Sequence, residues 1–410
     1  MNASSNTIRY RTLAGTVLTQ FALGSVYTWS LFNAQLSAKL SEPVSQVAFA
    51  FGLLSLALAV ASSLAGKLQE RFGVQRVTLG AGLMLGLGFF LTAQANNLVM
   101  LYLCAGVLVG LADGAGYLLT LSNCVKWFPE RKGLVSACAI GAYGLGSLGF
   151  KYINLALLAR FSLETTFELW GLIAMAMVVA GSLLMRDAPQ QQAAAQQTAA
   201  QQTASHDYTL AEAMRQPQYW MLALMFLTVC MSGLYVIGVA KDIGESYVHL
   251  PALTAANAVA VIAVANLSGR LVLGILSDKM PRIRVITIAQ VSALAGMLTL
   301  LFVPLNATLF FLAIACVAFS FGGTITVYPS LVSDFFGLNN LTKNYGVIYL
   351  GFGIGSIVGS IVASLFGGFL ATFHLILALL IVALLFSLTI RQPGSSKEAE
   401  FEAEPHLGKA

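Results

Sequence analysis

The sequence predicts an all-α membrane protein with twelve transmembrane helices in two pseudo-symmetric six-helix bundles. Of the 410 residues, 58% are hydrophobic and only 10% are charged, whereas soluble domains carry roughly 25% charged residues. Apolar runs also recur at the length of about 20 residues that an α-helix needs to cross a bilayer. The twelve predicted spans are residues 12–34, 45–66, 77–95, 98–124, 134–158, 166–186, 217–240, 253–276, 283–303, 307–332, 343–368 and 371–390.

A duplicated charged turn divides these spans into two similar halves. Gly66–Arg71 follows the second span and Gly274–Lys279 follows the eighth, 208 residues later. In each turn an acidic and a basic residue stand four and five positions after the glycine. A second repeat relates Gly141–Ser147 to Leu350–Ser356 with an offset of 209. Two similar halves are the architecture of many secondary transporters.

The middle of the chain separates the two halves. Residues 187–207 form a Gln/Ala/Thr-rich tract without a periodic apolar face, which is the composition of a flexible linker. We therefore predict an N-terminal six-helix bundle in residues 1–186 and a C-terminal six-helix bundle in residues 208–391. The polar tail, residues 392–410, is predicted to be cytoplasmic and disordered. Tyr208–Arg215 is expected to form a short amphipathic surface helix.

Basic residues predict the orientation of the chain. With a cytoplasmic N-terminus, seventeen Lys and Arg residues lie on the cytoplasmic side, and only Lys39, Arg160 and Lys241 lie on the opposite side. This asymmetry satisfies the positive-inside rule and places both termini in the cytoplasm. The first apolar stretch is too long for a cleavable signal peptide and lacks a small-residue cleavage site. We expect a multi-pass protein of a bacterial inner (cytoplasmic) membrane.

Composition and motifs exclude several other classes of protein. The net charge of +5 reflects topology and does not indicate nucleic-acid binding. The five cysteines show neither metal-ligand spacing nor a disulfide framework, so we expect no metal and no cofactor. The chain lacks a G-x-x-x-x-G-K-[ST] loop, which argues against an ATP-driven pump. No nucleophile–base pair is evident, so an enzyme is the least favoured interpretation.

The twelve spans, the two halves and the two G-x-L-x-[DE]-[RK] turns resemble the major facilitator superfamily over residues 10–391. Local motifs are similar to the oxalate/formate antiporter family within it. These motifs are Asn123–Leu134, Ser268–Arg270 with Ser277–Lys279, Ser333–Gly337 and Lys343–Gly346. The resemblance implies the major facilitator fold.

The same resemblance implies a central anion site that combines one basic residue with aromatic side chains. The substrate-binding positions that it transfers to this chain are Arg270, Tyr27, Tyr117, Tyr349 and Phe321. Three positions depart from the family pattern: Phe352 replaces a lysine, Val26 a glutamine and Ile325 a tyrosine. The lost polar groups argue against oxalate as the preferred substrate. Phe352 remains a candidate, because Tyr345, Tyr349 and Phe352 have the i, i+4, i+7 spacing of one helix face.

Three charged residues within the predicted spans are further candidates. Arg270 must face the interior, because exposure to lipid costs on the order of 2.5 kcal/mol or more. Its guanidinium can hold a carboxylate through two parallel hydrogen bonds, and a structural ion pair is the alternative. Asp113 is a proton-coupling candidate, because burial and nearby cations change the proton affinity of a carboxyl group; a permanent pair with a cation is the alternative. Lys151 is a second anion ligand, a partner of Asp113, or a side chain that snorkels to the outer interface.

The duplicated turns predict a role in conformational gating. The residues concerned are Gly66, Glu70, Arg71, Gly274, Asp278 and Lys279. Their charged side chains lie at cytoplasmic helix ends, where bridges to neighbouring helices would stabilise the state that is closed on that side. Exposed ion pairs contribute less than about 1 kcal/mol each, but only a few kcal/mol separate the states of such an equilibrium. The alternative is that the turns only retain topology.

These observations predict a secondary active transporter that moves a small carboxylate by alternating access. Monocarboxylates such as formate, lactate or pyruvate are favoured, and oxalate remains a candidate. The mechanism is either proton symport, with H⁺ as the second partner, or anion exchange. We expect a monomer surrounded by membrane lipid. The alternative function is a membrane receptor that binds a small carboxylate without transporting it.

Overall fold

The computed structural model describes residues 3–128, 132–188, 207–337, 340–366 and 368–393. The secondary structure of these residues is entirely helical. Ten of the described helical segments are long and apolar enough to span a membrane. With the first helix and the helix that begins at Lys132, they account for the twelve segments that the sequence predicts. Most of the predicted linker and of the predicted tail, residues 189–206 and 394–410, lies outside the described residues.

The N-terminal half contains six membrane-length segments, some of which change helix type. The first begins as an α-helix and continues as a 3-10 helix, and the fourth contains a π-helical turn. The elements are α1 (Ala3–Leu23), η1 (Gly24–Leu31), α2 (Asn33–Leu40), α3 (Val44–Phe72), α4 (Val74–Ala93), α5 (Leu98–Leu101), η2 (Tyr102–Leu108), α6 (Val109–Trp127), α7 (Lys132–Leu158) and α8 (Leu163–Leu184).

The C-terminal half repeats this arrangement after a short surface helix. That helix is α10 (Leu210–Ala213), which is shorter than predicted and begins with a capping box between Thr209 and Glu212. The remaining elements are α11 (Pro217–Asp242), η4 (Ile243–Tyr247), α12 (Ala252–Ala255), α13 (Asn257–Ser277), α14 (Arg282–Phe302), α15 (Ala307–Phe336), α16 (Leu341–Phe366) and α17 (Phe369–Thr389).

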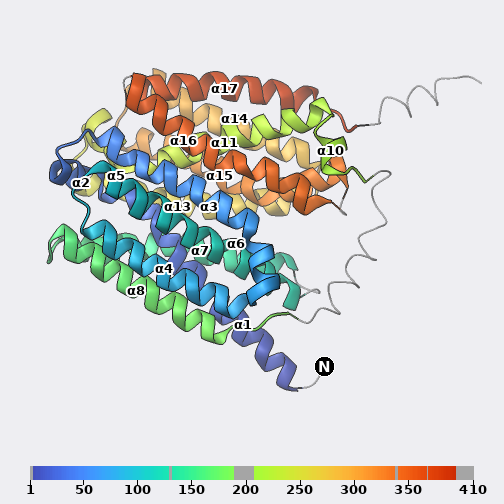
Figure 1. Ribbon diagram of the computed structural model, residues 1–410. Helices are drawn as coiled ribbons and strands as arrows, with labels where there is room; N and C mark the ends of the chain where they lie inside the picture. The colour runs from blue at the N-terminus through green and yellow to red at the C-terminus, as the bar shows by residue number, and fades with distance from the viewer. Residues whose placement is uncertain (1–2, 129–131, 189–206, 338–339, 367, 394–410) are drawn as a thin grey trace, which may run out of the picture.

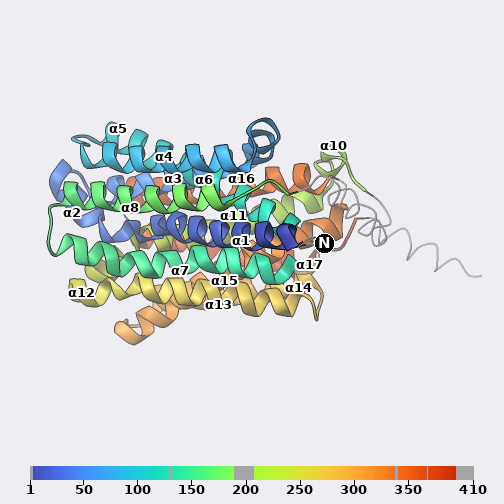
Figure 2. The ribbon, with the colours of Figure 1, turned by 90° about the horizontal axis from the view of Figure 1, so that it is seen from below.

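The long helices run side by side along one common direction, and the two halves lie next to each other (Figure 1). Within the halves, α4 packs on α8 and α3 on α6, as α14 packs on α17 and α13 on α15. Between the halves, α3 packs on α16, α7 on α13, and η1 on α11. We call the end of the molecule that carries α2, α5 and α12 the α2 end, and the opposite end, where α1 begins and α10 lies, the α10 end (Figures 1 and 2).

Glycines set the closest helix crossings, and the crossings repeat between the halves. A Cβ atom on Gly114 of α6 would overlap the backbone carbonyl of Leu58 on α3. A Cβ atom on Gly322 of α15 would overlap the backbone carbonyl of Asn266 on α13. Both members of the second pair lie 208 residues after those of the first. Small residues allow such close backbone approach, which stabilises helix packing in lipid. The internal repeat is therefore present in the packing as well as in the sequence.

Three hydrogen bonds join the two halves near the α2 end. The Asn33 amide at the start of α2 donates to the Gly238 carbonyl at 2.8 Å and to Oδ2 of Asp242 at 2.7 Å, both on α11. On the other flank, Nζ of Lys151 on α7 donates to Oδ1 of Asn257 on α13 at 2.7 Å. Asn33, Asp242 and Lys151 are 3% exposed or less and Gly238 is buried, whereas Asn257 is exposed. The halves are thus connected at this end by two buried hydrogen bonds and one that is partly buried.

Filling the Gly114 crossing is expected to destabilise the protein. Gly114→Val should lower the apparent melting temperature of the purified protein, because overpacking a close contact costs typically about 1–3 kcal/mol. The matched control is Gly80→Val on α4, where a Cβ atom meets nothing within 4 Å. Equal melting temperatures for the two variants would show that the crossing is not tightly packed.

Candidate functional site

A small cavity lies at the centre of the molecule, where helices from both halves meet. Its volume is about 10 Å³, which is room for about one water molecule and far less than the roughly 300–1,000 Å³ typical of sites for drug-sized ligands. The N-terminal half contributes its wall from η1, α3, α6 and α7, and the C-terminal half from α13, α15 and α16. The lining residues are Tyr27, Leu58, Tyr117, Tyr143, Arg270, Ile325, Tyr349 and Phe352. The cavity is therefore nearly closed in this structure, and a ligand larger than water needs the lining residues to move apart.

The structure brings together most of the residues that the sequence assigned to a substrate site. Five of the seven predicted residues line the cavity: Tyr27, Tyr117, Arg270, Tyr349 and Phe352. Phe321 lies behind the wall, fully buried, with its ring centroid 6.1 Å from that of Phe352. Phe321 therefore supports Phe352 from the second layer. Lys151 is bonded to Asn257 in the contact between the halves and is not among the lining residues.

Arg270 is held by one edge of its guanidinium group. Its Nε donates to Oδ1 of Asn266, one helical turn earlier on α13, at 2.8 Å. The residue is 6% exposed, and its Nη1 makes no hydrogen bond within the described structure. Because a guanidinium presents five N–H donors in a fixed planar fork, the bond to Asn266 orients the group and leaves further donors for a ligand. Among the described residues, Arg270 is the one Lys or Arg that lines this cavity.

Aromatic rings form two opposing walls around this cation. In the N-terminal half, the ring of Tyr143 makes edge contacts with Tyr27 and Tyr117, at centroid distances of 5.2 and 5.1 Å. In the C-terminal half, Tyr349 and Phe352 stack at 5.4 Å. Edge-to-face and stacked pairs at these distances are favourable and rigid arrangements. The walls therefore limit the size of any molecule that reaches Arg270.

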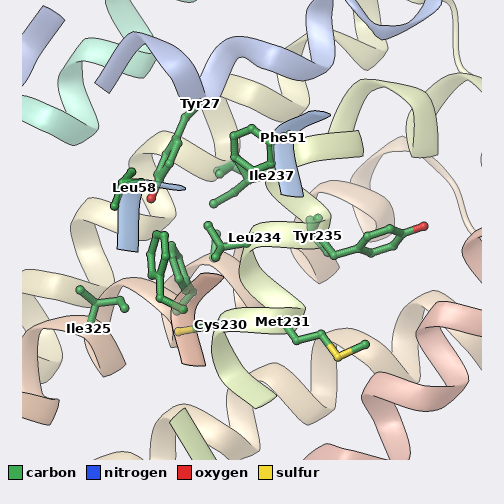
Figure 3. Close-up of a cluster of buried hydrophobic side chains, with 14 of the residues drawn as sticks. Tyr27, Phe51, Leu58, Cys230, Met231, Leu234, Tyr235, Ile237 and Ile325 are labelled. Carbon is green, nitrogen blue, oxygen red and sulfur yellow. The ribbon is translucent and has the colours of Figure 1, made fainter. Parts of the chain in front are cut away.

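Apolar side chains pack beside the cavity. Figure 3 shows Tyr27, Leu58 and Ile325 around the same buried region as Phe51 and Leu234. The hydroxyl of Tyr27 points toward Leu58, and Phe51 packs against the Tyr27 ring at 6.2 Å. Burial of these side chains fixes the position of the aromatic walls.

Asp113 reaches the cavity through Tyr143. The Tyr143 hydroxyl donates to Oδ2 of Asp113 at 3.0 Å. Asp113 is fully buried on α6 and is absent from the cavity lining, whereas Tyr143 lines the cavity. Its Oδ1 has no hydrogen-bond partner in the described part of the chain. Asp113 and Lys151 bond to different partners, so the predicted alternative of an Asp113–Lys151 pair is not present in this structure.

Sequence analysis missed Tyr143 as a site residue, although the internal repeat contained the signal. Phe352 lies 209 residues after Tyr143, and Ile325 lies 208 residues after Tyr117. All four residues line the cavity. Equivalent positions of the two halves therefore meet around the site, so each candidate in one half indicates another candidate in the other.

The proposed gating residues lie at the α10 end, away from the cavity. Glu70, Arg71, Asp278 and Lys279 are exposed, and none of them forms an ion pair with another described residue. The guanidinium of Arg71 lies over the ring of the adjacent Phe72. A Cβ atom on Gly66 would meet nothing within 4 Å, and one on Gly274 would meet only the Thr326 methyl group at 3.5 Å. The charged turns are therefore loosely packed in this structure.

Other polar contacts hold these turns in place. In the first turn, the Asp187 carboxylate accepts hydrogen bonds from the Val74 amide and from Gln69. Gly73 has a φ of +79°, a conformation that suits glycine and allows the sharp reversal from α3 into α4. Near the second turn, Arg282 forms an ion pair with Asp334 on α15.

Comparison with known proteins agrees with the fold. The family model described as Major Facilitator Superfamily matches residues 13–341 and 239–409. The chain belongs to the major facilitator superfamily. It is therefore a membrane transporter with several transmembrane helices, and not an enzyme.

Individual relatives cover most of the chain. An uncharacterized MFS-type transporter, YhjX of Escherichia coli (strain K12), is 74% identical over 385 residues, 94% of this chain and 95% of that protein. The oxalate:formate antiporter of Oxalobacter formigenes is 26% identical, covering 80% and 77%. Monocarboxylate transporter 12 of Mus musculus is 21% identical, covering 78% and 71%. The solved structure of a D-xylose-proton symporter shares the fold, with a TM-score of 0.71 at 13% identity over 94% and 98% of the two chains.

Proposed function

We propose that this member of the major facilitator superfamily transports small monocarboxylates by alternating access. The observation that carries the proposal is the single guanidinium of Arg270, which keeps unused donors inside a small aromatic cavity between the two halves. A carboxylate accepts two parallel hydrogen bonds from such a group. The names of two distant relatives, an oxalate:formate antiporter and a monocarboxylate transporter, agree with a carboxylate substrate.

The charge of the cavity favours one carboxylate group over two. A dianion such as oxalate would leave one carboxylate without a cation, and burying an unpaired charge is costly. Phe352 occupies the position where the resemblance implies a second cation, and it stacks on Tyr349. Formate, lactate and pyruvate each bring one carboxylate and a small body that aromatic walls can accommodate. Oxalate remains a candidate substrate only if a second cation reaches the site.

Asp113 and Tyr143 supply a possible route for a coupled proton. The Tyr143 hydroxyl contacts both the Asp113 carboxyl group and the cavity. A proton bound by Asp113 in the N-terminal half and a monocarboxylate bound by Arg270 in the C-terminal half would be released together on the other side, so the net charge transported is zero. This arrangement favours proton symport, and anion exchange at Arg270 alone is the alternative.

We propose that the α10 end faces the cytoplasm and the α2 end faces outward, in a bacterial inner membrane. The excess of basic residues near the α10 end supports this orientation. In that orientation the bonds of Asn33 and Lys151 close the outer side of the protein. Glu70, Arg71, Asp278 and Lys279 would then form their bridges in the opposite state, which is closed toward the cytoplasm.

Removal of the guanidinium is expected to weaken substrate binding. Arg270→Ala should weaken carboxylate binding at least about tenfold, because hydrogen bonds to charged groups contribute about 1.5–3 kcal/mol. Arg270→Lys should weaken it less, since it keeps the charge but loses the planar fork. Binding of formate, lactate and pyruvate is measured as the ligand-induced rise in melting temperature.

The matched control for Arg270 is Arg284→Ala, which removes an exposed arginine from α14. Uptake of labelled formate, lactate and pyruvate into proteoliposomes is measured in parallel. Normal transport by Arg270→Ala would refute the proposed anion site. Binding by the wild-type protein without accumulation would identify a receptor in place of a transporter.

A second cation is expected to shift specificity toward dianions. Phe352→Lys should raise the ratio of oxalate to formate affinity by about tenfold or more, because it adds a charged donor to the cavity wall. Phe352→Leu, which removes the ring without adding charge, is the control. Competition by each unlabelled acid against labelled substrate gives both affinities. If a folded Phe352→Lys protein keeps the wild-type ratio of affinities, the charge of this cavity does not set the specificity.

Neutralising Asp113 is expected to uncouple transport from the proton gradient. Asp113→Asn should eliminate accumulation driven by a pH gradient while substrate exchange across the membrane continues. Tyr143→Phe should reduce the same accumulation, because it removes the hydroxyl between Asp113 and the cavity. Glu245→Gln, an acid paired with Lys241 near the α2 end, is the control. Gradient-driven accumulation that persists in Asp113→Asn would eliminate this residue as the coupling site.

A further inference from the structure

Lys151 is a buried cation with an uncharged partner. The residue is 3% exposed and lies between α7 and α13, in the contact between the two halves. Its Nζ donates to the amide oxygen of Asn257 at 2.7 Å and lies 4.5 Å from the centroid of the adjacent Tyr152 ring. No carboxylate in the described part of the chain forms an ion pair with it. An amide oxygen and an aromatic ring are the partners that replace an anion here.

The residues near Lys151 on α7 do not provide a counter-charge either. Ser147, one turn earlier, donates to the Gly144 carbonyl of its own helix. Asn154, nearly one turn later, donates to the Thr28 hydroxyl on η1. Both are buried and uncharged. Burying an ammonium group without an anion is costly, and ionisable residues inside membrane spans usually mark the path of a substrate or ion.

Lys151 lies between the central cavity and the α2 end. It follows Tyr143, which lines the cavity, by eight residues on α7, or about 12 Å at 1.5 Å per residue. Its partner Asn257 begins α13, the helix that also carries Arg270. An anion that moves from the α2 end to Arg270 between α7 and α13 would pass the contact between Lys151 and Asn257.

On the opposite flank of the molecule, the equivalent contact between the halves contains no cation. Ser360 of α16 lies 209 residues after Lys151, and α16 packs on α3 as α7 packs on α13. The Ser360 hydroxyl donates to the Ser356 carbonyl of its own helix. Ser360 also borders a cavity of about 190 Å³ between α3, α11, η4, α16 and α17, which no described charged residue lines. The halves meet at Ser360 without a buried cation, so sealing alone does not account for Lys151.

We propose that Lys151 is the residue that captures the substrate anion when the α2 end is open. In the structure described here, Oδ1 of Asn257 occupies the position of a carboxylate oxygen at the ammonium group. Separation of the halves at the α2 end breaks this bond and exposes Lys151 to the outside. The ammonium then binds an incoming carboxylate, which passes to Arg270 as Asn257 returns to Lys151. This inference rests on the proposed transport of small carboxylates and assigns them a second site that is available in one state only.

The test compares the two faces of the transporter. Lys151→Met keeps the length of the side chain and removes its charge. It should raise the KM for external formate, lactate or pyruvate at least tenfold in proteoliposomes of known orientation. The affinity measured from the α10 side should change less than twofold, because Arg270 remains intact. Lys151→Arg, which keeps the charge, should hold the external KM within threefold of the wild-type value.

The matched control is Lys39→Met. Lys39 lies on α2 at the same end of the molecule, but it already pairs with Glu164 at 2.9 Å and donates to the Ala93 carbonyl. Its substitution should leave the affinities on both sides unchanged. An unchanged external KM in Lys151→Met would overturn the capture role. An equal loss of affinity on both sides would overturn it as well, in favour of a structural role.

A second variant tests the exchange of partners. Asn257→Asp gives Lys151 a permanent anionic partner, so it should lower the rate of uptake from the outside at least tenfold while binding from the α10 side persists. Unchanged external uptake by this variant would contradict the inference even if Lys151→Met does not fold. If the wild-type protein neither binds nor transports any of the three acids, the proposed function itself fails. Wild-type transport together with normal variants refutes only the role of Lys151.

Discussion

The constraint on which this structure depends is the cost of placing charge in a lipid bilayer. Arg270, Asp113 and Lys151 lie within membrane-length helices, and each is less than 10% exposed. The two halves enclose all three side chains, and each finds a different uncharged hydrogen-bonding partner: an asparagine, a tyrosine and a second asparagine. Because none of these partners carries an opposite charge, the three groups remain able to exchange an anion or a proton.

The internal repeat provides the frame, and its differences provide the chemistry. The crossings at Gly114 and Gly322 have the same geometry in both halves. At equivalent positions inside this frame, however, the N-terminal half has the polar pair Asp113 and Tyr143, and the C-terminal half has the apolar pair Phe321 and Phe352. The cation of the site, Arg270, lies instead in the C-terminal half. The proposed anion and proton sites are therefore on different halves and meet only at the central cavity.

The division of charge between the halves also connects binding with movement. Rocking of two packed halves changes which residues meet across their contact, and such contacts have discrete arrangements. Asn33 and Lys151 make their bonds to the C-terminal half near the α2 end, whereas the charged turns at the α10 end are exposed. In the opposite state, the bonds of Asn33 and Lys151 would break and the charged turns would form bridges at the α10 end. The two states need to differ in free energy by only a few kcal/mol.

The sequence by itself determined that this chain is a helical membrane transporter with two related halves, and it identified Arg270 and most of the aromatic wall. Helical spacing shows which residues share a face, as it does for Tyr345, Tyr349 and Phe352 on α16. It does not show which part of that face reaches a cavity, because this depends on how helices from distant parts of the chain cross. Tertiary structure alone placed Tyr143 in the wall, Phe321 behind it and Lys151 against Asn257. The physical reason is that close glycine contacts between helices, rather than the period of any one helix, set the rotation and depth of each side chain.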